Sequence, residues 1–173
     1  MRDNPEVETN YERAFAAAGR SDVLEAWVGL IAAIRSRMDV RRYELVTLAA
    51  ARRLRSSYCS LAHGKVLLEL GEPVREIASD RGAAGLDEVD LAVMDFAERV
   101  VDDASSIGDS ERQRLRDVGL TDAEIMDVAL AASARCFFSK SLDAIGVLPD
   151  ASFRELGPEL QELLVVGRPI AEE

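Results

Sequence analysis

Hydrophobic residues recur at steps of three and four along most of this chain, which is the period of an amphipathic α-helix. The clearest run covers residues 23–37, with apolar positions at Leu24, Trp27, Val28, Ile31 and Ile34. No Asn-Gly or Asp-Gly turn joins two alternating segments, so the pattern predicts no pair of strands. It therefore predicts an all-α protein whose helices pack as a bundle.

Residues typical of helix starts and stops divide the rest of the chain. Asp39, Asp87 and Asp109 can begin helices, and Gly71 and Gly146 suit the left-handed position that ends them. The expected helices cover residues 8–18, 23–37, 40–55, 58–70, 73–80, 88–103, 109–118 and 122–145, with a short amphipathic turn near 160–164.

Three further N-terminal caps are expected. Thr121 and Glu124 match the S/T-x-x-E capping box, in which side chains satisfy two free N–H groups reciprocally. Ser21 or Asp22 can cap the helix over 23–37. Ser56 can cap the helix over 58–70, after a tight turn near Ser56–Ser57. These caps place the boundaries of the second, fourth and eighth helices.

Length and composition favour one globular domain. The chain has 173 residues, of which 48% are hydrophobic and 31% are charged. A chain of this size buries a sizeable core without metals or disulfides. We expect an N-terminal extension or short helix over 1–20, a helical domain over 21–150 and a C-terminal tail over 151–173.

The charge balance narrows the function classes. The net charge is −11, which disfavours nucleic-acid binding because that needs phosphates to be neutralised by Lys and Arg. The local basic residues are expected to be solvated helix faces or subunit contacts: Arg41, Arg42, Arg52, Arg53 and Arg55. The acidity itself is typical of a soluble surface.

Compartment signals favour the cytoplasm. No apolar run approaches the length of a transmembrane helix, and the polar, acidic start of the chain lacks the features of a signal peptide. Cys59 and Cys136 are far apart in the chain and do not form a disulfide framework. We therefore expect a cytoplasmic protein with reduced thiols and no membrane partner.

One stretch, RRYELVTLAAARRLRSSYCSLAHGKVLLELG, concentrates the reactive residues. Cys59 and His63, the only histidine, are four residues apart and share one helix face. A thiolate is the nucleophilic form of cysteine, and a nearby imidazole or a helix N-terminus favours it. The spacing alone also fits a small buried cysteine beside a capped or surface histidine. Zinc binding is the lesser alternative, because a zinc site needs three or four ligands; we expect no metal and no cofactor.

The wider stretch resembles the AhpD-like alkylhydroperoxidases of the carboxymuconolactone decarboxylase family. The motif of that family is a Glu followed twelve residues later by C-x-x-C-x-x-x-H. With Cys59 on the second motif cysteine, His63 lies on the motif histidine and Glu44 on the motif glutamate. The flanking ELVTLAAARR, AHGK and DAIGVLPD are also similar to the family, so the resemblance covers roughly residues 20–150. It implies the AhpD-like helical bundle, an active site at Cys59, His63 and Glu44, and a homo-oligomer, a trimer or a hexamer.

The chain departs from the family pattern at two positions near the site. Ser56 occupies the place of the first motif cysteine, and Tyr58 occupies the place of a histidine often found between the cysteines. In the peroxidase members one cysteine attacks the peroxide and the other resolves it as a disulfide. Ser56 cannot form that disulfide, so Ser56 and Tyr58 are expected to modulate the site.

Three functions stay open at this point. In the first, Cys59 attacks a peroxide, Glu44 and His63 relay protons, and an external thiol reductant resolves the sulfenic acid. In the second, His63 performs the acid–base chemistry of the decarboxylase members, without a redox step. In the third, the scaffold is a non-catalytic binding or stress-response protein.

Other residues have structural interpretations beside the functional ones. Cys136 is expected to fill the core as a small hydrophobe, and its alternative is a resolving thiol brought close to Cys59. Glu44 either pairs with an arginine at the surface or turns partly inward, where burial would raise its pKa. Trp27 is expected to anchor the core or an interface.

Overall fold

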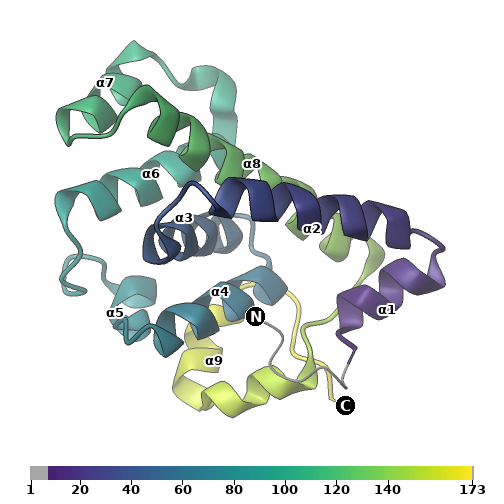
Figure 1. The fold of residues 1–173 in the computed structure, drawn as a ribbon. Helices are drawn as coiled ribbons and strands as arrows, with labels where there is room; N and C mark the ends of the chain where they lie inside the picture. Colours follow the sequence, from purple (N-terminus) through teal and green to yellow (C-terminus); the bar gives the residue numbers. More distant parts are fainter. Residues whose placement is uncertain (1–7, 173) are drawn as a thin grey trace.

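A computed structural model describes residues 8–172 of the chain, and all regular structure within that range is helical (Figure 1). The all-α prediction is confirmed. The first seven residues, on which the expectation about a signal peptide partly rests, lie outside the described residues. The α-helices are α1 Asn10–Ala17, α2 Ser21–Arg35, α3 Val40–Arg53, α4 Ser57–Glu69, α5 Val74–Ser79, α6 Glu88–Asp103, α7 Asp109–Asp117, α8 Asp122–Ile145 and α9 Pro158–Leu164.

Helix α3 is the centre of the molecule. Every residue from Tyr43 to Ala51 is buried, because α4, α6 and α8 all pack against this helix (Figure 1). This central run is largely apolar, and a largely apolar helix is stable only when other elements cover it. The alanines Ala49, Ala50 and Ala51 let the neighbouring helices come close, while the arginines expected on α3 lie toward its two ends.

Local caps define most helix ends as predicted. Thr121 and Glu124 form the capping box of α8, Asp39 accepts from the N–H of Arg42 at 3.0 Å, and Gly146 ends α8 with φ 80°. The expected cap of α2 is wrong, because this helix already begins at Ser21 and its N-cap, Arg20, makes no side-chain cap.

The turn between α3 and α4 sets the position of the reactive stretch. Arg55 adopts a left-handed backbone conformation with φ 58°, which reverses the chain after α3. Ser56 follows as the N-cap of α4, but its side chain makes no capping hydrogen bond. The expected Ser56 cap is therefore wrong in its chemistry, although the tight turn is confirmed. Cys59 lies in the first turn of α4.

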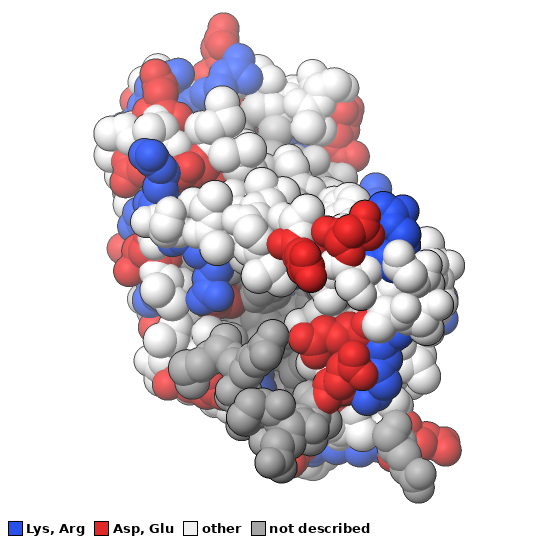
Figure 2. All heavy atoms as spheres, turned by 45° about the vertical axis from the view of Figure 1, so that its right-hand side comes forward, with Lys and Arg blue, Asp and Glu red and all other residues white. Residues whose placement is uncertain are grey.

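The charged surface is interleaved rather than divided. Figure 2 shows acidic and basic side chains mixed on one face, with uncharged surface between them. Arg41 pairs with Glu72 and Asp90 at 2.7 and 2.6 Å, and Arg53 pairs with Asp102 at 2.6 Å. Arg41 and Arg53 thus form ion pairs within the chain. Among the described residues, no helix is both long and apolar enough to cross a membrane.

The C-terminal segment packs against the helical bundle and is hydrogen-bonded to it. Helix α9 packs against α4 and α5. Arg52 of α3 donates to the carbonyl of Leu163 and, at 2.8 Å, to that of Ala78, so one guanidinium joins the C-terminal ends of two helices. Beyond α9, the N–H of Gly167 donates to Ser57 Oγ at 2.8 Å.

We expect Gly167→Ala to lower the free energy of unfolding by about 2 kcal/mol, a typical cost of overpacking. A Cβ at this position would overlap the carbonyl oxygen of Arg55, so the tail has to move away from α4. Urea denaturation measures the change. Gly29→Ala is the matched control, because a Cβ on the exposed side of α2 meets no atom within 4 Å. That variant should be neutral or slightly stabilising, and equal stability of both variants would contradict the prediction.

Candidate active site

Helices α3 and α4 bring two of the predicted site residues into contact. Glu44 on α3 points to α4, where its Oε2 lies 2.6 Å from Nδ1 of His63. Cys59 precedes His63 by one turn of α4 and is buried, with 1% of its surface exposed. The register of the motif therefore brings Glu44 and His63 into contact, with Cys59 one helical turn away on α4.

Glu44 is a buried carboxylate, 1% exposed, between positively charged neighbours. Its Oε1 lies 3.4 Å from the guanidinium of Arg35 on α2. Burial alone would raise the pKa of Glu44, but His63, Arg35 and Arg135 outweigh it and lower the pKa below its ordinary value. The expectation of a raised pKa for Glu44 is thus wrong. Its three charged or hydrogen-bonding partners lie on other helices and could not be identified from its neighbours in the sequence. Glu44 is a carboxylate at neutral pH.

His63 is neutral at neutral pH and presents one tautomer. Burial and the nearby charge of Arg135 lower the pKa of His63, and the attraction of Glu44 does not compensate. A neutral imidazole beside a carboxylate donates its Nδ1–H to it, which fixes the tautomer. The second nitrogen, Nε2, is buried and has no hydrogen-bond partner among the described residues. It carries the lone pair, so it can accept a proton.

Arg135 on α8 completes the cluster. It is 5% exposed, and its Nη1 donates to Sγ of Cys59 at 3.5 Å. Burial alone would lower the pKa of Arg135, but Cys59 and Tyr43 outweigh it and raise the pKa above its ordinary value. We refer to Cys59, His63, Glu44, Arg35 and Arg135 as the Cys59 site.

Aromatic rings hold the arginines of the Cys59 site. The guanidinium of Arg135 lies 5.3 Å from the ring centroid of Trp27 and 5.7 Å from that of Phe138, and these two rings stack at 4.7 Å. Arg35 lies over the ring of Tyr43 at 5.1 Å. Such contacts favour a cation that has lost water. Trp27 is therefore a core residue, as one of its two expected roles proposed.

Sequence reasoning missed Arg135 as a functional residue. One signal was present: between Asp127 and Lys140 on the long helix, Arg135 is the only charged residue. A single charge inside an apolar helix is rarely buried without a partner. Its partner, however, lies 76 positions away in the chain, beyond the reach of any spacing rule.

The remaining candidate residues lie around the site with other contacts. Ser56 is fully buried, and its hydroxyl has no hydrogen-bond partner among the described residues. Tyr58 donates its hydroxyl to Asp150, a residue after α8, instead of to the thiol. Cys136 is half-buried, and both cysteines are free. Burial raises the pKa of Cys136, and its role as a resolving thiol stays a prediction.

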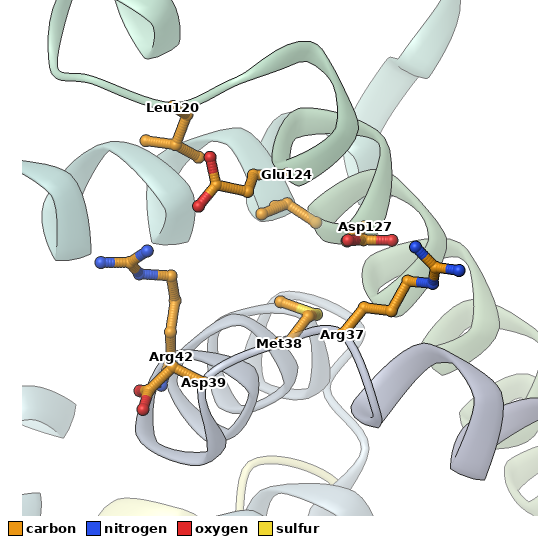
Figure 3. A pocket seen from close by; sticks show the side chains of 8 residues that line it. Arg37, Met38, Asp39, Arg42, Leu120, Glu124 and Asp127 are labelled. Atoms are coloured by element: carbon orange, nitrogen blue, oxygen red, sulfur yellow. The ribbon is translucent and has the colours of Figure 1, made fainter.

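Two surface hollows lie away from these residues. One, of about 30 Å³, lies between α8 and the start of α3 and is large enough for water. Figure 3 shows that Glu124 and Asp127 face Arg37 and Arg42 across it. The other, of about 550 Å³, lies beside the C-terminal end of α3. Neither contains a residue of the Cys59 site, which is nearest to solvent at Arg35 and His63, with 41% and 12% of their side chains exposed.

The buried pair predicts loss of stability in acid. The pKa of His63 is lowered in the folded chain from an ordinary 6.5, so the unfolded chain binds more protons below that pH. Its stabilising contribution is complete above about pH 6.5 and is lost as the pH falls, by at most about 1.4 kcal/mol per pH unit. Glu44, with an ordinary pKa of 4.5, adds to the loss further down. Chemical denaturation between about pH 7 and pH 5 measures the slope.

His63 is the only histidine in the chain, which makes the control simple. In His63→Gln we expect the slope above about pH 5 to become nearly flat, because no other side chain ordinarily titrates there. Equal slopes in the two proteins would contradict the assignment.

Solved structures share this arrangement of helices. The chain is similar to an uncharacterized peroxidase-related protein with an alkylhydroperoxidase AhpD core from Ralstonia eutropha JMP134, with a TM-score of 0.76, 22% identity and coverage of 88% of this chain and 82% of that one. An uncharacterized peroxidase-related protein from Silicibacter sp. TM1040 matches with a TM-score of 0.71 and 20% identity, over 77% of this chain and 73% of that one. The third is a protein of unknown function from Agrobacterium tumefaciens, for which an AhpD-type role in antioxidant defence has been suggested. It matches with a TM-score of 0.69 and 18% identity, over 78% of this chain and 94% of that one.

These matches show the fold. The bundle is an AhpD-like helical fold, as the resemblance implied. No family model matches the sequence, and no curated protein matches it. Within residues 8–172, no group of three or more His, Cys, Asp or Glu side chains could hold a metal ion.

Proposed function

We propose that this chain, which has the AhpD-like fold, is a thiol peroxidase in which Cys59 attacks the peroxide. One observation carries the proposal: a hydrogen bond joins Glu44 to His63, and the buried Cys59 thiol lies one turn of α4 before that histidine. A thiol nucleophile needs a base for its proton and an acid for the leaving group. The free Nε2 of His63, one turn from Cys59 on α4, suits both tasks.

The reaction balances with the residues of the site. The proton of Cys59 passes to His63, whose imidazolium is stabilised by the carboxylate of Glu44. The sulfur then attacks one oxygen of the hydroperoxide; an S–O bond forms, the O–O bond breaks, and the leaving oxygen takes the proton from His63. Cys59 is oxidised to a sulfenic acid, and the peroxide is reduced to an alcohol, or to water if the substrate is hydrogen peroxide.

An external thiol would complete the cycle. Ser56 stands where a second thiol would be needed for a disulfide within the motif, and a hydroxyl cannot provide it. A small-molecule or protein thiol would therefore attack the sulfenic acid, release water and form a mixed disulfide, which a second thiol reduces. We place this chemistry in the cytoplasm, where reduced thiols are abundant.

The test of the proposal is peroxide-dependent sulfenic acid at Cys59. The protein is treated with a small excess of hydrogen peroxide or an organic hydroperoxide, trapped with a sulfenic-acid reagent and mapped by mass spectrometry. We expect trapping at Cys59 and little at Cys136, and we expect catalytic turnover only when a thiol is added. Equal and slow modification of both cysteines would reject the peroxidase.

We also propose that copies of this chain associate as a trimer or a hexamer. Several large apolar side chains on α2 and α8 are exposed. They are Val28, Leu30, Met126, Leu130 and Phe137. Exposed apolar area of this kind is typical of subunit contacts. Sedimentation equilibrium measures the mass, and a monomer at micromolar concentration would reject this part of the proposal.

A further inference from the structure

Arg135 is a charge that the protein has removed from water. Its side chain lies in the core beside the stacked rings of Trp27 and Phe138, and 5% of the residue is exposed. A guanidinium stays protonated under all physiological conditions. A buried charge without a partner is strongly destabilising, so a stable fold supplies an opposite charge.

The neighbouring groups leave Cys59 as the direct partner of Arg135. Of the anions, Glu44 on α3 is near enough for the charge of Arg135 to lower its pKa, but its two oxygens are engaged by His63 at 2.6 Å and by Arg35 at 3.4 Å. Tyr43, also on α3, has a pKa raised chiefly by burial and stays neutral. His63 on α4 is neutral as well.

Cys59 remains, with Sγ 3.5 Å from Nη1 of Arg135. A charged donor at this distance from a sulfur favours the thiolate, as it does for other acidic groups beside an arginine. The first turn of α4 adds the positive end of the helix dipole. The sulfur of Cys59 is thus in direct contact with the buried guanidinium.

We infer that Arg135 and Cys59 form a buried guanidinium–thiolate pair once the proton of Cys59 has passed to His63, and that Arg135 is the residue that stabilises the ionised sulfur. The pairing does not depend on the peroxidase reaction. If Cys59 attacks a hydroperoxide, the second part of the inference, which rests on the proposed function, follows. The sulfur loses its negative charge to the breaking O–O bond, and the guanidinium lies where it can stabilise the leaving oxygen until His63 delivers a proton.

The experiment measures the alkylation rate of each cysteine by iodoacetamide, with mass spectrometry as the readout. In the wild type, we expect the rate at Cys59 to rise less steeply between about pH 6 and pH 8.5 than the rate at Cys136, because only the thiolate reacts and Arg135 stabilises it. The rate at Cys136 should rise through the same range, since burial raises the pKa of this thiol. A rate at Cys59 that rises about tenfold per pH unit, as for a neutral thiol, would overturn the inference without any variant.

Arg135→Met tests the pair directly, because methionine keeps an unbranched, largely apolar side chain and removes the guanidinium charge. We expect alkylation of Cys59 at neutral pH to slow by about tenfold or more, the usual effect of losing an opposite charge in contact. The rate at Cys136 should stay unchanged and so reports that the fold is intact. Arg52→Met is the matched control, since it removes another partly buried arginine whose donors bind only carbonyls. Unchanged alkylation of Cys59 in Arg135→Met would overturn the inference.

Two further outcomes separate the inference from the proposed function. If Arg135→Met slows alkylation but the wild type forms no sulfenic acid with peroxide, the pair stands and the peroxidase fails. If sulfenic acid forms in both proteins at the same rate, the peroxidase stands and the role of Arg135 fails. Faster labelling of Cys136 in Arg135→Met would mean an opened fold, and the wild-type pH profile then decides.

Discussion

Peroxide consumption is expected to fall to the uncatalysed background in Cys59→Ser. The hydroxyl of serine has about the size of the thiol, so the core around α4 stays filled, but it is far less acidic and its oxygen cannot accept an oxygen atom as sulfur does. Cys59 is the buried sulfur beside Arg135 and one turn from His63. A coupled assay with added thiol measures the rate, and circular dichroism checks the fold.

Cys136→Ser is the matched control for that variant, because it makes the same substitution on α8. We expect it to keep most of the activity, since an external thiol resolves Cys59. Loss of turnover in both variants would instead indicate that Cys136 resolves the sulfenic acid. Activity on a lactone that survives Cys59→Ser but is lost on replacing His63 would support the acid–base alternative of the decarboxylase members. Binding without turnover in any assay would support the non-catalytic one.

The second large effect is expected for Glu44→Gln, with a loss of about 10²- to 10⁴-fold in peroxide turnover, the usual contribution of positioned proton transfer. The amide keeps the shape of the carboxylate but not its charge. Without that charge, the imidazolium that forms when His63 takes the thiol proton loses its stabilising partner. The amide can also turn its NH₂ toward Nδ1 of His63. The imidazole proton would then lie on Nε2, which could no longer accept the proton of Cys59.

The control is Glu72→Gln, which removes a carboxylate in an ion pair with Arg41 at 2.7 Å outside the Cys59 site. It should change stability slightly and turnover hardly at all, because partly exposed ion pairs contribute about 1 kcal/mol or less. Comparable losses of turnover in both variants would mean that Glu44 affects turnover by stabilising the fold and not by proton transfer. Wild-type turnover in Glu44→Gln would remove the Glu44–His63 relay from the mechanism.

The helices could be predicted well because their signals are short-range. The capping box at Thr121, the cap at Asp39 and the left-handed Gly146 each depend on atoms within one turn of helix, and the sequence contains those atoms side by side. The caps expected at Ser21 and Ser56 were wrong because a cap also depends on atoms outside its own helical turn. A local residue type permits a cap, but the packing of the neighbouring helices decides whether its side chain turns to the free N–H groups.

The site was predicted in part. The spacing of Cys59 and His63 on one helix, with Glu44 in register, was readable because two of the three lie on a single helix face and the family motif supplies the third. Arg135 was not readable, since its contact with Cys59 joins α8 to α4 across the core. The direction of the Glu44 pKa was predicted wrongly, because it depends on charges from α2, α4 and α8 together.

The sequence by itself determined the helical period, most helix ends, the acidic surface and the stretch that carries the reactive thiol. These properties follow from interactions between residues within about one helical turn. Only the tertiary structure decided that α3 is buried on all sides, that Glu44 binds His63 and Arg35, and that a guanidinium from α8 meets the sulfur of Cys59. Burial removes the water that would otherwise screen these charges, so their chemistry depends on which distant segments share the same dry space.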